Sequence, residues 1–195
     1  MDTHASIDTV AHPHLRQLLA DVAATTDDAQ QLRATLSDAQ LAWKPEPGVW
    51  NVLECLQHLI IVDVLYFGQI DAALEQATRG DGSAPFRPSW FGRTFFGFVS
   101  PEGKRKIKTL RLFKPPQALT DVTIVERFVE HQEELTNLLR RADGADLNGN
   151  KFSSPASRLI RFSLGEGLTM LVMHQQRHLQ QARRLTEHPD FPGDG

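Results

Sequence analysis

The chain is poor in cysteine, and it lacks a long uninterrupted apolar run. Cys55 is the single cysteine among 195 residues, so an internal disulfide, a thiolate zinc site and a CxxC redox pair are all excluded. The longest apolar stretch, residues 59–67, is broken by Asp63 and is far shorter than the roughly 20 residues that span a bilayer. The polar N-terminus shows no secretory signal. We therefore expect a cytoplasmic protein with no membrane partner.

The acidic net charge hides a basic segment. The formal net charge is −3, yet residues 87–114 carry eight basic side chains against one acid, Glu102, so this segment is +7 and the remainder is −10. Such a balance argues against a whole-surface nucleic-acid binder, and no DNA- or RNA-binding motif accompanies the basic residues. We expect no nucleic-acid partner, but a local patch that attracts an anionic small molecule.

Four segments have the apolar periodicity of helices, and no segment has the alternation typical of a strand. The predicted helices cover residues from about 13 to 36, 52 to 77, 121 to 141 and 164 to 187. Two of them begin at a capping box, in which Asn51 is followed by Glu54 and Ser163 by Glu166. The pattern predicts an all-α fold, a four-helix bundle with a long crossover between helices two and three, in one domain over residues 1–195.

The crossover, residues 79–116, differs in composition from the helices. It is rich in proline and glycine, and its aromatic side chains interleave with Arg87 and Arg93. One interpretation is a lid that covers a site and attracts an anionic substrate. The others are a dimer contact, a short extra helix pair covering the bundle, or plain packing, and we favour packing.

Three histidines stand on faces that should be apolar. His174 and His178 are four residues apart, so both imidazoles lie on one face of the last helix, in a stripe of leucines. His58 lies in the middle of the most apolar helix. Each could be an ordinary core histidine that bonds a carbonyl or water. A metal ion satisfies one nitrogen of each ring at once, and three imidazoles from facing helices form a site with open positions.

These residues lie in two motifs that resemble signatures of the DinB-like superfamily. The first is WKPEPGVWNVLECLQHL, residues 43–59, with a Pro/Gly turn and a tryptophan before a helix that carries one metal-binding histidine. The second is HxxxHxxQ, which begins at His174 and ends at Gln181. The resemblance covers about residues 8–187 without residues 79–116. This sequence has Asn51 where serine or threonine is commoner, and asparagine caps a helix equally well.

The resemblance implies a four-helix bundle, often dimeric, in which His58, His174 and His178 bind one divalent metal ion. The ion would be nickel, zinc or iron. Characterised members of the superfamily include transferases and isomerases that use a low-molecular-weight thiol, so a thiol-dependent S-transferase acting on a small molecule is the function it implies. Metal-dependent hydrolysis and a non-catalytic, metal-stabilised dimer are the alternatives.

Several neighbouring residues have two interpretations each. Glu54 lies one turn before His58, where it could orient that histidine or act as a general base on metal-bound water, but the cap explains it better. Gln181 could hydrogen-bond near the site or face solvent. His131 could be a fourth ligand, although a flanking position is favoured. Cys55 is predicted to be a core residue.

Overall fold

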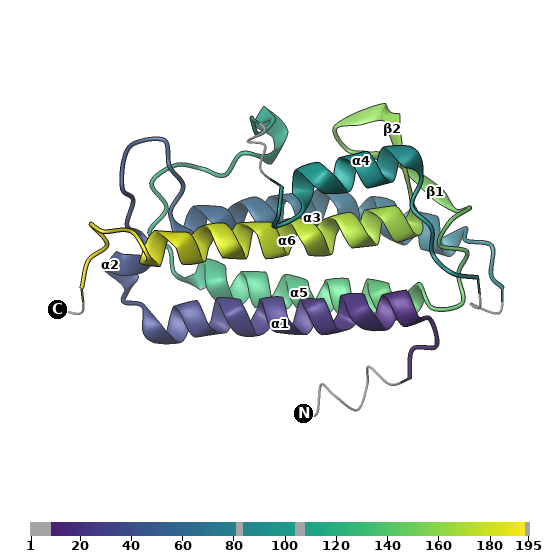
Figure 1. The fold of residues 1–195 in the computed structure, drawn as a ribbon, viewed down its shortest axis with the longest axis horizontal. Helices are drawn as coiled ribbons and strands as arrows, with labels where there is room; N and C mark the ends of the chain where they lie inside the picture. The colour runs from purple at the N-terminus through teal and green to yellow at the C-terminus, as the bar shows by residue number, and fades with distance from the viewer. Residues whose placement is uncertain (1–8, 81–83, 104–107, 194–195) are drawn as a thin grey trace.

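Four long helices lie side by side and make up most of the molecule (Figure 1). The computed structural model describes residues 9–80, 84–103 and 108–193. The long helices are α1 (Pro13–Thr35), α3 (Val52–Glu75), α5 (Thr123–Arg141) and α6 (Leu164–Thr186). Helices α1 and α3 each contact both α5 and α6. The predicted mostly helical fold is therefore confirmed, and the long connection between the second and third long helices is where the sequence placed it.

The two predicted capping boxes are present, and they set the start of the two site-bearing helices. The Asn51 side chain accepts a hydrogen bond from the Glu54 backbone, and the Glu54 carboxylate accepts one from the Asn51 backbone. Ser163 and Glu166 make the same reciprocal pair at α6. Each box satisfies amides that the first helical turn would otherwise leave unpaired.

Helix α3 is the most apolar of the four long helices and is largely buried. Its length and composition would suffice to cross a membrane, yet 67% of that window is buried inside the protein. The buried side includes polar groups as well, His58 and Asp63 among them. This burial is the pattern of a core helix, packed between α5 and α6.

The buried side chains form two apolar clusters with a polar layer between them. One cluster contains Val22, Val62, Leu135 and Val172 and extends toward the start of α6, and the other contains Ala29, Ile60, Phe128 and Leu179 and extends toward its end. Between these levels each long helix places a buried polar residue: Thr25, Asp63, Gln132 and Gln175. The Gln175 amide donates to the Asp63 carboxyl at 3.1 Å.

The sequence predicted no strands, and this prediction is wrong. Strands β1 (Lys151–Ser154) and β2 (Ser157–Ser163) form an antiparallel hairpin directly before α6. Phe152 and Phe162 face each other across it, and both are buried. Because serines and arginines fill most other positions, the alternation that marks a strand is weak, and the segment has the composition of a loop.

Two short helices and one 3-10 turn complete the described residues. Helix α2 (Asp38–Leu41) follows α1, and neither it nor the hairpin was foreseen from the sequence. Helix α4 (Trp90–Val99) and the 3-10 turn η2 (Arg111–Phe113) belong to the crossover. Figure 1 shows α4, η2 and the hairpin together on the side of α3 and α6, away from α1 and α5. Residues 104–107, which hold three basic residues of the basic segment, lie outside the described residues.

Candidate metal centre

The structure brings the three predicted histidines together. His58 extends from α3, and His174 and His178 extend from adjacent turns of α6. The Nε2 atom of His174 lies 3.3 Å from Nε2 of His58 and 3.1 Å from Nε2 of His178. The antiparallel course of α3 and α6 places residue 58 opposite residues 174–178, so residues 116 positions apart meet.

These separations suit three nitrogens that bind one ion. Two nitrogens at about 2.0–2.1 Å from a common metal, at angles between a right angle and the tetrahedral angle, are roughly 2.8–3.4 Å apart. The measured 3.1 and 3.3 Å fall within that range. Of the described residues, only this trio forms a cluster of histidine, cysteine or carboxylate side chains with metal-ligand spacing.

The proton positions favour a cation as well. His58 Nδ1 lies 2.6 Å from the Phe113 carbonyl oxygen, which can only accept, so Nδ1 carries the proton and Nε2 presents a lone pair. His174 Nε2 faces both other Nε2 atoms, and one proton there cannot serve both contacts well. His174 Nδ1 is buried, and no residue in the described part of the chain hydrogen-bonds it. A cation at the meeting point of the three Nε2 atoms removes this conflict.

Burial keeps the three imidazoles neutral. Burial lowers the pKa of His58 to about 4, although the hydrogen bond to the Phe113 carbonyl acts to raise it. Burial, with the neighbouring histidines and the Arg177 charge, lowers the pKa of His174 and of His178 well below the ordinary value. A hydrogen bond with the Gln181 side chain raises the pKa of His178 and partly offsets these effects. Neutral imidazole is the form that binds metals, so the site is ready for an ion at neutral pH.

A strap of the crossover, residues 113–119, crosses the start of α3 and holds His58. The Phe113 carbonyl accepts from His58. The Ala118 backbone N–H donates to Glu54 Oε1 at 2.7 Å, and the Leu119 carbonyl accepts from the Asn51 side chain at 3.0 Å. Ala118 has a φ of 57°, a conformation that costs a residue with a Cβ free energy and persists where surrounding contacts impose it. The strap is thus fixed to α3 at three points.

The Trp50 ring packs against the imidazoles of His58 and His178. Its ring centroid lies 4.9 Å from that of His58 and 5.8 Å from that of His178. The Pro/Gly turn before α3 places it there, and the capping box at Asn51 then starts the helix. Trp50 and the strap together leave His58 and His178 only 3% and 9% exposed.

Glu54 is engaged as a helix cap and an anchor. One carboxylate oxygen accepts from the Asn51 backbone, and the other accepts from Lys44 Nζ at 2.5 Å and from the Ala118 backbone. The side chain is fully buried. The cap interpretation is therefore confirmed, and the role of Glu54 as a general base stays a prediction with no free oxygen to support it.

The other residues considered from the sequence lie outside the cluster. His131 is on α5, where its ring packs 6.0 Å from that of Phe67, and its pKa is lowered by burial. Cys55 is buried, and burial raises the pKa of its thiol, as expected of a core residue.

The structure supports the packing interpretation of the crossover for part of its aromatic side chains. Helix α4 packs on α6, with Phe95 against Phe162 of the hairpin, whereas Trp90 is exposed. The lid interpretation stays a prediction, because the crossover group that contacts His58 is the backbone carbonyl of Phe113 and not an aromatic ring of α4. Sequence reasoning could not find Phe113, Ala118 and Leu119 as site residues, because they act through backbone groups that carry no side-chain signal.

A family model matches most of the chain. The model of the DinB superfamily matches residues 21–182. This chain belongs to the DinB superfamily. The matched range contains His58, His174 and His178, and it extends through residues 79–116. No curated protein and no solved structure gives a significant match to this DinB-superfamily chain.

Proposed function

We propose that this DinB-superfamily protein is a four-helix-bundle metalloenzyme that holds one divalent ion through His58, His174 and His178. The observation that carries the proposal is the convergence of three Nε2 atoms at 3.1 and 3.3 Å, with His58 and His178 buried and His174 partly exposed. Nickel, zinc and iron are the candidate ions, since imidazole suits each of them. The proposed reaction is the transfer of a low-molecular-weight thiol to a small electrophile.

The residues of the chain have separable roles in this proposal. The three imidazoles would hold the ion, which when bound supplies a Lewis acid that favours the thiolate form of a thiol. The Phe113 carbonyl holds the His58 proton on Nδ1 and thereby keeps its Nε2 free. Trp50 lies over two of the rings and excludes water from that side. No general base is needed if the nucleophile is a thiolate, which agrees with the engaged state of Glu54.

Two alternatives receive different support. Metal-dependent hydrolysis would need a base, and Glu54, the carboxylate one turn from His58, has both oxygens occupied. A non-catalytic role, in which the ion stabilises the fold, is favoured by the burial of His58 and His178. The second alternative is therefore the one that experiments must separate from the enzyme.

The metal site is tested by elemental analysis of the purified full chain beside His58→Ala, His174→Ala and His178→Ala. We expect one ion per chain in the natural protein and an affinity lower by at least about 100-fold in each variant. His131→Ala is the matched control, a helix-borne histidine outside the cluster. Because Trp50 lies against His58, titration with Ni²⁺ should also quench its fluorescence. Stoichiometric metal in all three variants would rule out the site.

Catalysis is separated from a structural role by thermal melting with and without thiols. If the enzyme proposal holds, a low-molecular-weight thiol such as glutathione or cysteine raises the melting temperature of the metal-loaded protein and leaves that of the metal-free protein unchanged. If the ion is structural, chelation lowers the melting temperature and no thiol has an effect on either form.

A further inference from the structure

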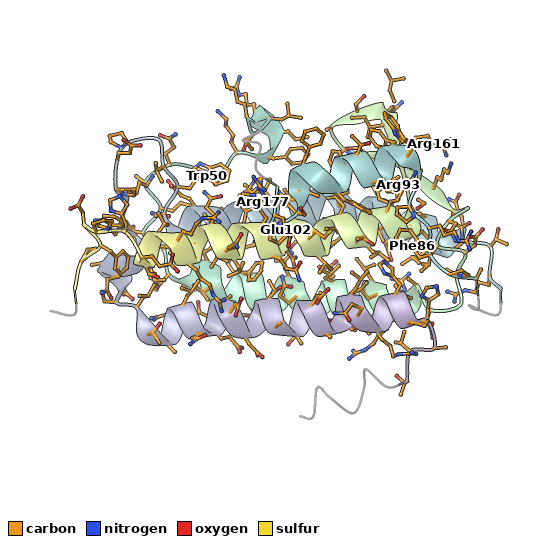
Figure 2. The ribbon with its side chains drawn as sticks, viewed as in Figure 1. Trp50, Phe86, Arg93, Glu102, Arg161 and Arg177 are labelled. Carbon is orange, nitrogen blue, oxygen red and sulfur yellow. The ribbon has the colours of Figure 1, made fainter. Side chains whose placement is uncertain are left out.

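A cavity lies toward the far end of the molecule from the histidines. It has a volume of about 420 Å³ and is enclosed by the loop before α4, the hairpin and the first turn of α6. This volume is within the range of sites that take small organic ligands. Figure 2 places Arg161, which lines the cavity, toward one end of the molecule and Trp50, which covers the histidines, toward the other.

The cavity is too far from the metal centre to be part of it. Its wall includes Ser163 and Glu166 at the start of α6, while the first metal-binding histidine of that helix is residue 174. At 1.5 Å per residue, Ser163 and His174 are about 16 Å apart along the helix. A ligand that fills the cavity therefore does not contact the three imidazoles.

Positive charge dominates the cavity wall. Arg87, Lys151 and Arg161 line it, against a single acid, Glu166. Glu166 is 3% exposed and its carboxylate accepts hydrogen bonds from the Ser89 and Ser163 backbones. Burial acts to raise the pKa of Glu166, but these bonds and the charge of Lys151 outweigh burial and lower it, so the group is ionised.

Two guanidinium groups at the cavity have no partner among the described residues. Lys151 acts on Glu166, whereas the side chains of Arg87 and Arg161 make no hydrogen bond or ion pair with any residue in the described part of the chain. The four charged groups sum to +2. Two planar guanidinium groups at one cavity are suited to a phosphate or carboxylate, which each can bind through two N–H groups.

Half of the uncharged wall residues are apolar, and this apolar part extends to the surface. Phe91, Leu159 and Ile160 line the cavity beside the arginines. Leu159 is 94% exposed and Phe91 is 39% exposed, so both present apolar surface to water at the cavity. An inorganic anion would leave these surfaces in water, whereas an anion that carries an apolar group would cover them.

We propose that this cavity is a binding site for an amphipathic anion, a phosphate or carboxylate joined to an alkyl or aryl group, separate from the metal centre. The charged head lies against Arg87 and Arg161, and the apolar part lies on Phe91, Leu159 and Ile160. The ligand comes either from solution or from a membrane as an anionic lipid; the second source would be peripheral contact and needs no spanning helix.

The test uses octyl phosphate as the probe, below the concentration at which it forms micelles, with the full chain in excess chelator. Calorimetric titration should show saturable binding, while inorganic phosphate and the uncharged octyl glucoside bind at least about tenfold more weakly. The Arg87→Gln and Arg161→Gln variants should each lose at least about tenfold in affinity for octyl phosphate. Because both side chains are exposed, these variants should melt at the temperature of the natural protein.

Arg158→Gln is the matched control, since Arg158 is an exposed arginine of the same hairpin that does not line the cavity. Its affinity should be unchanged. Equal affinity for octyl phosphate and octyl glucoside, or equal losses in the Arg158 and Arg161 variants, would overturn the proposal. Sedimentation with phosphatidic acid vesicles then identifies the source, because a membrane ligand makes the natural protein, but not Arg161→Gln, sediment, and a soluble ligand does not. The chelator keeps either outcome independent of the metal centre.

Discussion

Glu54 offers the sharpest single test, because a structural and a catalytic role predict opposite results. Its carboxylate accepts three hydrogen bonds, from the backbones of Asn51 and Ala118 and from Lys44 Nζ. Replacement by glutamine leaves one oxygen acceptor and introduces two N–H donors where donors already point. If Glu54 is a cap and an anchor, Glu54→Gln destabilises the protein even when no metal and no substrate is present.

The size of the loss follows from the groups left unpaired. A buried backbone N–H without an acceptor costs about 1–3 kcal/mol. Breaking a buried ion pair from one side costs about 3–5 kcal/mol, but Lys44 keeps 23% of its side chain exposed and can be solvated in part. We therefore expect the free energy of unfolding to fall by about 3 kcal/mol. The strap should loosen at Ala118, which would weaken metal binding by about 10–100-fold through the Phe113 carbonyl.

The assay is urea denaturation of the metal-free protein in excess chelator, followed by metal titration. Glu75→Gln is the matched control, since Glu75 is an exposed acid at the end of the same helix and should change stability by less than about 0.5 kcal/mol. A Glu54→Gln protein that unfolds at the same urea concentration as the natural one, binds metal normally and loses turnover would refute the anchor role. That result would establish the general-base role instead.

Three further predictions follow from buried groups and close contacts. The free energy of unfolding of the metal-free protein should fall as the pH is lowered from about 6.5 to about 4, because His58 binds a proton in the unfolded chain but not in the folded one. His58 alone accounts for a loss of about 3 kcal/mol. Urea denaturation that gives the same stability across this pH range would contradict the prediction. Burial raises the pKa of Asp63 in the folded protein, so as the pH rises the carboxyl loses its proton in the unfolded chain first, and this favours unfolding. Asp63→Asn removes that effect. The variant should therefore unfold at a higher urea concentration than the natural protein near pH 8 and at the same concentration near pH 4. Gly92→Ala should lower the melting temperature at a cost of about 1–3 kcal/mol, because the new Cβ would lie 2.3 Å from Glu166 Oε1, whereas Gly97→Ala in the same helix meets nothing and should stabilise it slightly.

The parts of the fold that the sequence predicted well are those with strong local signals. Helices α3 and α6 begin where a capping box stands, and α1 begins at Pro13 as a proline in the first turn requires. The three histidines were found because each interrupts an apolar face. Local patterns of this kind are present in the chain before any tertiary contact forms.

The parts that were missed depend on contacts between distant segments. The hairpin needs Phe152 and Phe162 to pack together, and a serine-rich sequence around them gives no regular alternation. The strap, residues 113–119, contacts α3 through backbone groups, and the side chains of these residues do not indicate which hydrogen bonds their backbones make. The basic segment was seen in the sequence, but hairpin residues were needed to place Arg87 beside Arg161 in one cavity.

The position of the metal centre within the core has a physical reason. The two apolar clusters do not merge, because at the level between them each long helix buries a polar side chain: Thr25, Asp63, Gln132 and Gln175. Neither polar atom of the Gln132 amide has a hydrogen-bond partner among the described residues, which costs free energy that an apolar residue of the same size would not cost. Gln175 is adjacent to His174, so the layer adjoins the ligands on α6. The Gln175–Asp63 hydrogen bond joins α6 to α3 at this level, one residue from His174. We expect this bond to fix the rotation of α6 against α3 and thereby to keep the three Nε2 atoms convergent.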